Sequence, residues 1–63
     1  MQGKIKWYKE NKGYGYIIGA DEETYFFEKT DCININETFK ENEKVLFIPN
    51  FIGMESARKV EKI

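Results

Sequence analysis

The segment that most constrains the fold of this 63-residue chain is Lys12-Gly13-Tyr14-Gly15-Tyr16-Ile17, in which glycine and tyrosine alternate after a lysine. Side chains on an extended strand point to opposite faces in turn, so Tyr14 and Tyr16 share one face while Gly15 and Ile17 share the other. Two rings side by side next to an ammonium group match an unstacked nucleic acid strand, because every base has a π face and every linkage a phosphate. The alternative is ordinary cross-strand packing, since tyrosine is a good strand former.

Aromatic residues are concentrated around this segment, with seven of the ten in the first twenty-seven positions. Trp7-Tyr8 precedes the segment and Tyr25-Phe26-Phe27 follows it. Three short strands of so small a chain cannot bury all of these rings. We therefore expect some rings to face solvent, and a group of exposed apolar side chains usually indicates a partner.

The length of the chain limits the kind of site it can hold. Sixty-three residues form one domain, 1–63, and a domain of this size buries only ~60% of the surface that its unfolded chain exposes. The core then has no room for a deep pocket of the ~300–1,000 Å³ typical of small-molecule sites, so we expect no small-molecule substrate. The hydrophobic fraction of 41% is too high for disorder. No apolar run approaches the ~20 residues that a membrane span needs, so we expect no membrane partner.

The chain lacks the residues that most catalytic and metal sites use. It has no histidine, and Cys32 is its only cysteine. We therefore expect no metal, no cofactor and no nucleophile paired with a base, and we do not expect an enzyme. Cys32 follows Asp31 and precedes Ile33, which favours a buried structural thiol over a reactive one.

The charge of the chain is segregated along its length. The net charge of −1 argues mildly against a nucleic acid partner. However, four lysines and one glutamate give the first twelve residues +3 and leave −4 for the other fifty-one. Such an arrangement can orient a polyanion on one face, although lysines also commonly guard an exposed strand edge. The N-terminus enters a strand-like pattern with no leader sequence, so we expect a cytoplasmic protein.

Alternation and turn residues predict five short strands, at residues 3–9, 14–18, 24–28, 44–48 and 54–61. A long irregular connection, 29–43, follows the third strand, and within it Ile33 and Ile35 are predicted to plug the core. Pro49 either ends the fourth strand or lies at an unpaired edge. This pattern predicts an all-β fold, a small five-stranded antiparallel barrel of the OB type, in which closure removes the exposed edges.

The faces of three aromatic positions depend on register. Alternation in the third strand places Tyr25 and Phe27 in the core, and Phe26 on the same face as Tyr14 and Tyr16. Strict alternation in the first strand would put Trp7 inside, whereas a β-bulge there would turn the indole outward. In the long connection, Phe39 is either a ligand contact at the tip of the loop or a core plug.

Two motifs of the chain resemble those of a protein family. Gly3-Lys4-Ile5-Lys6-Trp7-Tyr8 and Lys12-Gly13-Tyr14-Gly15-Tyr16-Ile17 are similar to the N-terminal half of a bacterial cold-shock protein, with Tyr where that family usually has Phe. The resemblance covers nearly the whole chain and is strongest in residues 3–31. It implies a five-stranded OB barrel that binds single-stranded RNA or DNA with little sequence preference and acts as an RNA chaperone.

The family's second motif corresponds here to Tyr25-Phe26-Phe27-Glu28-Lys29-Thr30-Asp31. Phe26 fits the stacking Phe of that motif, whereas Glu28 stands where the family has His. A carboxylate cannot stack as imidazole does and it repels phosphate, so this departure is expected to weaken binding.

The leading hypothesis is therefore a monomeric single-strand binding protein. Its predicted stacking rings are Trp7, Tyr14, Tyr16 and Phe26, with Tyr8 and Phe39 at the margin. Lys6 and Lys12 are predicted to contact phosphate, and Glu28 lies on the same face. The alternative is a small barrel that docks a protein partner through its aromatic face and has weak or lost nucleic acid binding.

Overall fold

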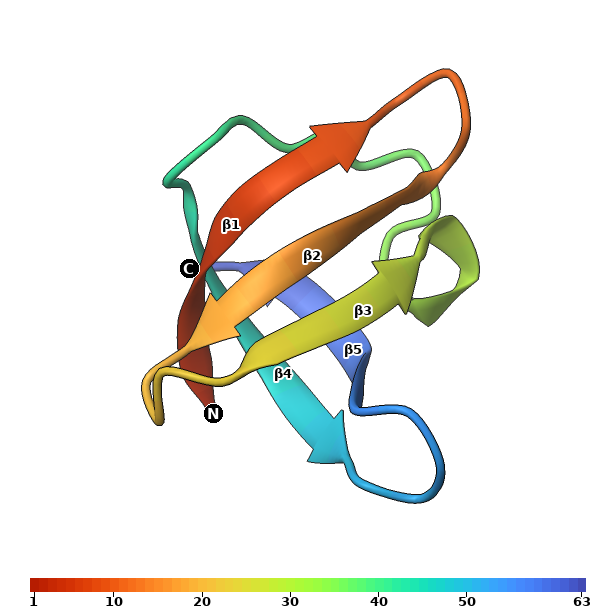
Figure 1. Ribbon diagram of the computed structural model, residues 1–63. Coiled ribbons are helices and arrows are strands. Elements are labelled where there is room, and N and C mark those ends of the chain that lie inside the picture. The colour runs from red at the N-terminus through yellow and green to blue at the C-terminus, as the bar shows by residue number, and fades with distance from the viewer.

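The five predicted strands form a closed barrel in the computed structural model, which describes residues 1–63 (Figure 1). Around the barrel the strands follow the order β1-β2-β3-β5-β4. The prediction of an all-β, five-stranded barrel of the OB type is confirmed. The strand bounds are β1 (Gln2–Lys9), β2 (Tyr14–Gly19), β3 (Thr24–Glu28), β4 (Lys44–Asn50) and β5 (Ser56–Lys62).

The barrel is mostly antiparallel, as predicted, and one seam is parallel. β1, β2 and β3 form an antiparallel meander, and β4 pairs antiparallel with both β1 and β5. β3 and β5 instead run parallel, with Phe26 opposite Ser56. The long connection after β3 carries the chain across to the free edge of β1. β5, which returns antiparallel to β4, must then run in the same direction as β3.

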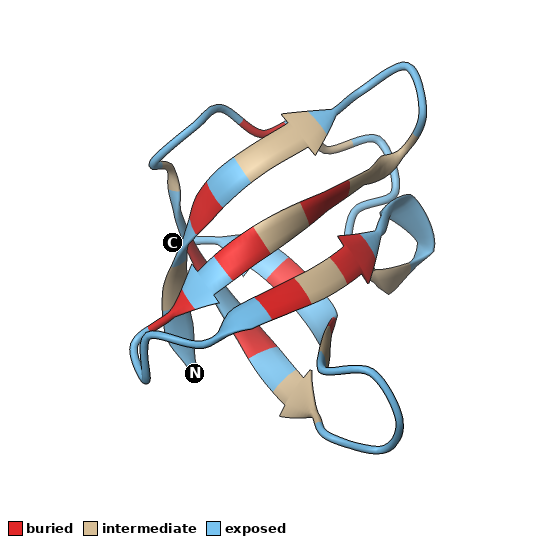
Figure 2. Ribbon diagram, in the orientation of Figure 1, coloured by how far each residue is buried: buried red, intermediate tan, exposed pale blue.

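The core lies between the inward faces of the five strands, and buried and more exposed positions alternate along β2, β3 and most of β4 (Figure 2). Such alternation is typical of a sheet with one face packed and the other in contact with water. Tyr25 and Phe27 are inside, as predicted, and the Tyr25 hydroxyl donates a hydrogen bond of 2.5 Å to Asp21. Nine buried side chains make up the core: Ile5, Ile17, Tyr25, Phe27, Phe39, Val45, Phe47, Ala57 and Val60.

The 29–43 connection begins with a short 3-10 turn, η1 (Lys29–Asp31). The prediction that Ile33 and Ile35 plug the core is wrong, because they are 61% and 51% exposed. Phe39 fills the core from this segment instead. Cys32 is half-buried against the core, and burial raises the pKa of its thiol to about 11, so the thiol is neutral at pH 7.

Pro49 lies within β4, opposite Ala57, so it does not end the strand. Two residues earlier, the Phe47 N–H donates to the Met1 carbonyl on the β1 side of β4. Alternate residues of a strand direct their backbone groups to the same side, so the nitrogen of Pro49 faces the same side, beyond the start of β1. The missing N–H therefore costs no ladder hydrogen bond, in agreement with the unpaired-edge alternative. The structure contains no helix with the length and apolar character that a membrane crossing requires.

Candidate nucleic-acid interface

A β-bulge in β1 sets the direction of Trp7. Ile5 lies opposite Ile17 on β2, but Trp7 lies opposite Tyr16, so β1 has one extra residue between the two pairs. That residue is Lys6. A bulge reverses the alternation beyond it, so the Trp7 side chain turns to the outside of the barrel. Of the two alternatives left open by the sequence, the bulge is the one observed.

Gly15 allows the backbone of β1 to approach β2 closely at this bulge. A Cβ atom at position 15 would overlap the Trp7 carbonyl oxygen and lie 2.9 Å from the Tyr8 Cα. Only glycine leaves room for this approach. A glycine inside a strand is typical of a bend or a close backbone approach, and here the approach is to the strand that carries Trp7.

Four aromatic rings gather on the outside of the meander, and we call Trp7, Tyr14, Tyr16 and Phe26 the outer ring face. Tyr16 lies opposite both Trp7 and Phe26, with ring centroids 5.1 Å and 5.5 Å away and interplanar angles of 61° and 66°. Tyr14 is 5.7 Å from Trp7 and 6.0 Å from Phe26. All four side chains are half-buried, and no two of them are stacked face to face. The face therefore presents unstacked rings from three strands to the solvent.

Lysine side chains lie around this face. Lys9 is opposite Tyr14 in the ladder, and its Nζ is 5.7 Å from the centroid of the Trp7 ring, within cation–π range. Sequence reasoning counted Lys9 only in the basic N-terminal stretch and missed it as a site residue. The bulge brings Lys9 onto the same face as Trp7. Lys6 occupies the bulge itself and Lys12 the β1–β2 turn; both are exposed and form no ion pair.

Glu28 lies at one end of the outer ring face, opposite Tyr14. Its placement on the same face as Phe26 follows the predicted register of β3. The Glu28 N–H donates to the Asp31 carboxylate at 2.9 Å. The Glu28 side chain is exposed and forms no ion pair with Lys12, Lys29 or any other cation. A negative charge without a cationic partner therefore borders the rings.

Two of the predicted contact residues belong to the inner surface of the barrel. Phe39 is only 7% exposed and meets Phe27 edge to face at 5.5 Å, so of its two predicted alternatives the core plug is the one observed. Tyr8 stacks on Phe27 at 5.6 Å with an interplanar angle of 11°. Tyr8 is half-buried, and burial is the main cause that raises the pKa of its hydroxyl. Its ring packs inward because it follows Trp7 directly after the bulge.

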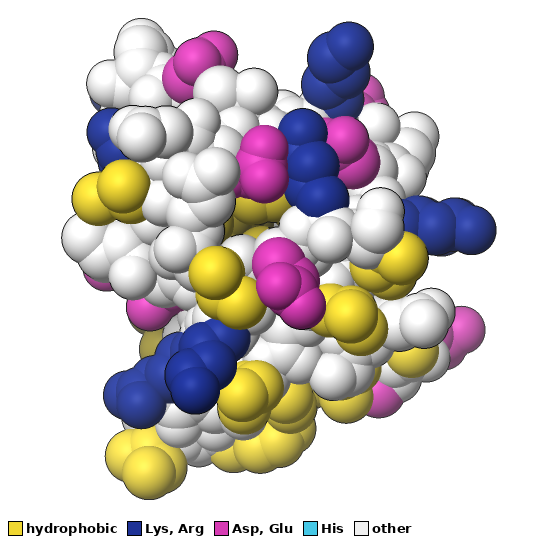
Figure 3. Space-filling model, turned by 180° about the vertical axis from the view of Figure 1, so that it is seen from behind, with side chains coloured by type: hydrophobic (Ala, Val, Ile, Leu, Met, Phe, Trp, Pro, Cys, Tyr) yellow, Lys and Arg dark blue, Asp and Glu magenta, His cyan; other side chains and the backbone are white.

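The rear of the barrel, formed by β4 and β5, differs from the outer ring face. Figure 3 shows hydrophobic side chains gathered mainly in the lower half of this view, with basic and acidic side chains among and above them.

A small closed barrel of five strands in this order is of the OB type, and comparison with known proteins identifies the family. Residues 1–63 match the model of the 'Cold-shock' DNA-binding domain. The chain is 39% identical over 49 residues to the Cold shock-like protein CspG of Escherichia coli (strain K12), a match that covers 75% of this chain and 70% of the relative. The same values hold for CspG of Escherichia coli O157:H7 and of Shigella flexneri.

The chain therefore belongs to the cold-shock domain family, which confirms the resemblance of its two motifs. Proteins of this family bind single-stranded nucleic acids and are not enzymes.

Proposed function

We propose that this protein binds single-stranded RNA or DNA with low sequence specificity through the outer ring face, and that it acts as an RNA chaperone. The observation that carries the proposal is the convergence of Trp7, Tyr14, Tyr16 and Phe26, unstacked, on one outer surface. Stacking on such rings accepts any base, because all bases have a π face. Little sequence preference follows from this kind of contact.

The lysines around the rings are proposed to contact phosphate. Lys6, Lys9 and Lys12 are exposed and without carboxylate partners, so their charges are available to a polyanion. Single strands lose affinity with a log–log salt slope of roughly −0.7 per neutralised phosphate, so three contacts predict a slope of about −2. A slope steeper than about −4 would mean that the cationic surface lies elsewhere.

The chaperone activity is a consequence of binding unpaired bases. A protein that binds only the single-stranded state shifts the pairing equilibrium toward that state by mass action. We further propose a monomer in the cytoplasm that uses neither cofactor nor small-molecule substrate. Closure of the barrel supports the monomer, because it leaves no long sheet edge to pair with another chain.

A fluorescence titration tests the proposal directly. We expect a pyrimidine-rich single strand of about six nucleotides, within the site size of an OB fold, to quench Trp7 emission at low salt, because an indole stacked on a base loses its free emission. Double-stranded DNA of the same sequence is the control. It should compete poorly, since its bases are already stacked on each other. Absence of quenching by the single strand would contradict the proposal.

A protein-docking module is the second candidate, and the position of Glu28 favours it. The carboxylate borders the rings without a cationic partner, and the chain carries a net charge of −1. Both features oppose a polyanion. This candidate predicts a folded protein that fails to bind single strands even at low salt, so the titration separates the two functions.

A further inference from the structure

Two lysines stand directly opposite each other where β1 meets β4. Lys4 and Lys44 are Cα partners in the antiparallel ladder, and both are exposed. Directly opposite side chains share one face with Cβ atoms about 5 Å apart, and like charges at this spacing repel each other. Neither lysine forms an ion pair; the ion pairs of the protein are those of Lys62 with Glu37 and Glu43. The pair is thus a local concentration of positive charge without a counter-ion.

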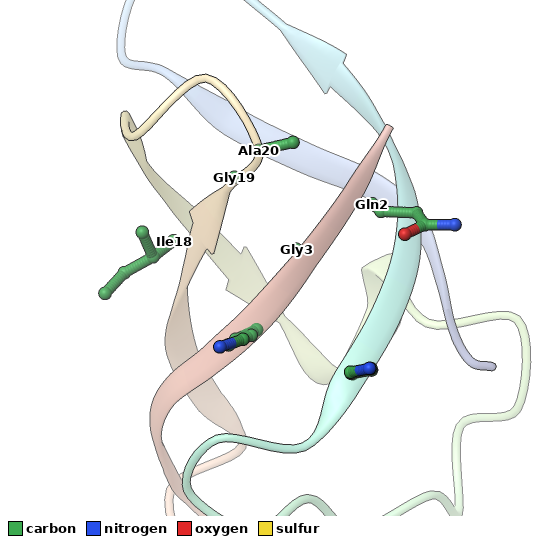
Figure 4. Close-up of a pocket in the computed structure, with 7 residues that line it drawn as sticks. Gln2, Gly3, Ile18, Gly19 and Ala20 are labelled. Atoms are coloured by element: carbon green, nitrogen blue, oxygen red, sulfur yellow. The ribbon is translucent and has the colours of Figure 1, made fainter.

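A hollow of about 310 Å³ lies beside this pair on the outside of the barrel. Its lining comes from residues 2–4 of β1, from residues 18–20 at the end of β2, and from Lys44, and none of these residues is acidic (Figure 4). The volume of the hollow is at the lower end of the range for small-molecule sites, but the hollow is a surface feature and lies outside the core.

The acidic residues that are next in sequence to the lining residues have partners elsewhere. Glu43, which precedes Lys44, accepts a hydrogen bond from the Lys40 N–H at 3.0 Å and pairs with Lys62 at 3.3 Å. Asp21 follows the lining residue Ala20 and accepts hydrogen bonds from the Tyr25 hydroxyl and the Glu23 N–H. Neither acid neutralises the lysine pair, which leaves its charge for an external anion.

The lysine pair continues the outer ring face. On β2, Ile18 is two residues beyond Tyr16 and therefore about 7 Å further along the same side, and Lys4 lies opposite Ile18. At the Tyr14 end the rings are bordered by Lys9 and Glu28, and beyond Tyr16 they are followed by the lysine pair. A polyanion that extends past the rings on the Tyr16 side meets two lysines that have no ion-pair partner.

We propose that Lys4 and Lys44 together bind a backbone phosphate of the single strand held on the outer ring face. A strand longer than the ring face then continues over β1 to the seam with β4. This inference rests on the proposed function, because the rings must first hold the strand. The ligand group is a phosphodiester, and free inorganic phosphate offers related chemistry that the test must separate.

The test compares two strand lengths by Trp7 fluorescence. Oligothymidylates of about six and about ten nucleotides, both within the site sizes of OB folds, are titrated against the wild type and the double variant Lys4→Gln/Lys44→Gln. A longer strand has more binding registers on either protein, so the informative quantity is the ratio of wild-type to variant affinity at each length. We expect a ratio near one for the short strand and about fivefold for the long strand, as for two exposed charge contacts. The salt slope for the long strand should also become shallower by about 0.7.

A matched control separates a local contact from a general charge effect. Arg58→Gln on β5 removes one positive charge from an exposed position on the rear of the barrel, as Lys44→Gln does at the seam. We expect Lys44→Gln to weaken only the long strand and Arg58→Gln to change neither. Equal weakening of both strands by the double variant, or the same effect from Arg58→Gln, would overturn the inference. The double variant should fold at least as well as the wild type, since it relieves repulsion between opposed charges.

A titration with inorganic phosphate tests whether the lysine pair binds the free anion instead of the backbone of a single strand. Phosphate is titrated at constant ionic strength while the backbone amides of Lys4 and Lys44 are followed by NMR. Saturable shifts at millimolar phosphate, together with unchanged long-strand binding in the double variant, would assign the site to the free anion and overturn the inference. If neither oligonucleotide binds the wild type, the proposed function fails as well. If the short strand binds and the length-specific loss is absent, only the inference fails.

Discussion

β3 carries aromatic rings on both of its faces, and the inner and outer rings differ in how they pack. Inside the barrel, Tyr25 and Phe27 are fully buried, and Phe27 is stacked on Tyr8 with an interplanar angle of 11°. Outside, Tyr16 and Phe26 are half-buried and meet edge to face at 66°. Phe26 and Phe27 are neighbours in the chain and have the same side chain. Their roles therefore differ because of the face on which each lies, not because of residue type.

The largest effect is expected from removing one of the inner rings. Phe27→Ala should lower the free energy of unfolding by about 3–5 kcal/mol, because it removes a buried ring and leaves a cavity among the remaining core side chains. Urea or thermal unfolding followed by circular dichroism measures this loss. In a domain of 63 residues a loss of this size is a large part of a total stability that is typically only about 5 kcal/mol.

The matched change on the outside is Phe26→Ala. We expect it to weaken single-strand binding by ~1–3 kcal/mol, the usual contribution of one stacked base, and to cost clearly less stability than Phe27→Ala. Tyr14→Ala should act in the same way. Trp7 quenching gives the affinity and the unfolding curve gives the stability. Wild-type affinity in both outer variants would remove the rings from the binding site.

A smaller effect is expected from replacing Glu28, the charged residue at the end of the outer ring face. Glu28→His should tighten single-strand binding by ~1–2 kcal/mol, because it adds a ring that can stack and removes a charge that repels phosphate. Glu28→Gln is the control, since it removes the charge alone. Its share of the gain should shrink as salt rises, whereas the stacking share should persist. Unchanged affinity for Glu28→His at low salt, with an intact fold, would exclude Glu28 from the binding face.

The smallest expected effect is that of removing the hydroxyl group of Tyr25, one of the inner rings. The hydrogen bond from the Tyr25 hydroxyl lowers the pKa of Asp21 below its ordinary value of 3.8. A carboxyl with a lowered pKa contributes stability that is present above the ordinary value and is lost as the pH falls through the lowered one. Tyr25→Phe should therefore destabilise the protein at neutral pH, and the difference from the wild type should diminish below about pH 4. A difference that stays constant from pH 7 to pH 2 would contradict this coupling.

Local pattern was sufficient to predict the parts of the fold that depend on neighbouring residues. The two faces of β2 and β3 follow from alternation alone, and Gly15 marked the close approach to β1. The direction of the Trp7 side chain could not be derived from the sequence. A β-bulge depends on how two strands pair, and the sequence of a single strand carries no periodic signal for it. Lys9 was missed for the same reason, since its face depends on that bulge.

The errors fall in the irregular segment, and the parallel seam of the barrel was not predicted. Ile33 and Ile35 were assigned to the core by their apolar character, but without a strand or helix period nothing directs such residues inward. Phe39 took that space, because a single large ring fills the end of the barrel against Phe27. The parallel pairing of β3 with β5 is a consequence of closure, so it depends on the whole chain and not on either strand.

The seam between β3 and β5 also bears on the order in which the chain assembles. It has one paired position, Phe26 with Ser56, and the Phe26 N–H donates to the Glu55 carbonyl at 3.1 Å. The meander strands are joined by connections of only four residues, whereas this seam joins residues thirty positions apart. Short loops close at a smaller entropic cost and contacts between near neighbours form sooner. We therefore expect β1–β3 to form first, with the inner rings open to water until β5 docks, and the newly made chain to be more prone to self-association than the closed barrel.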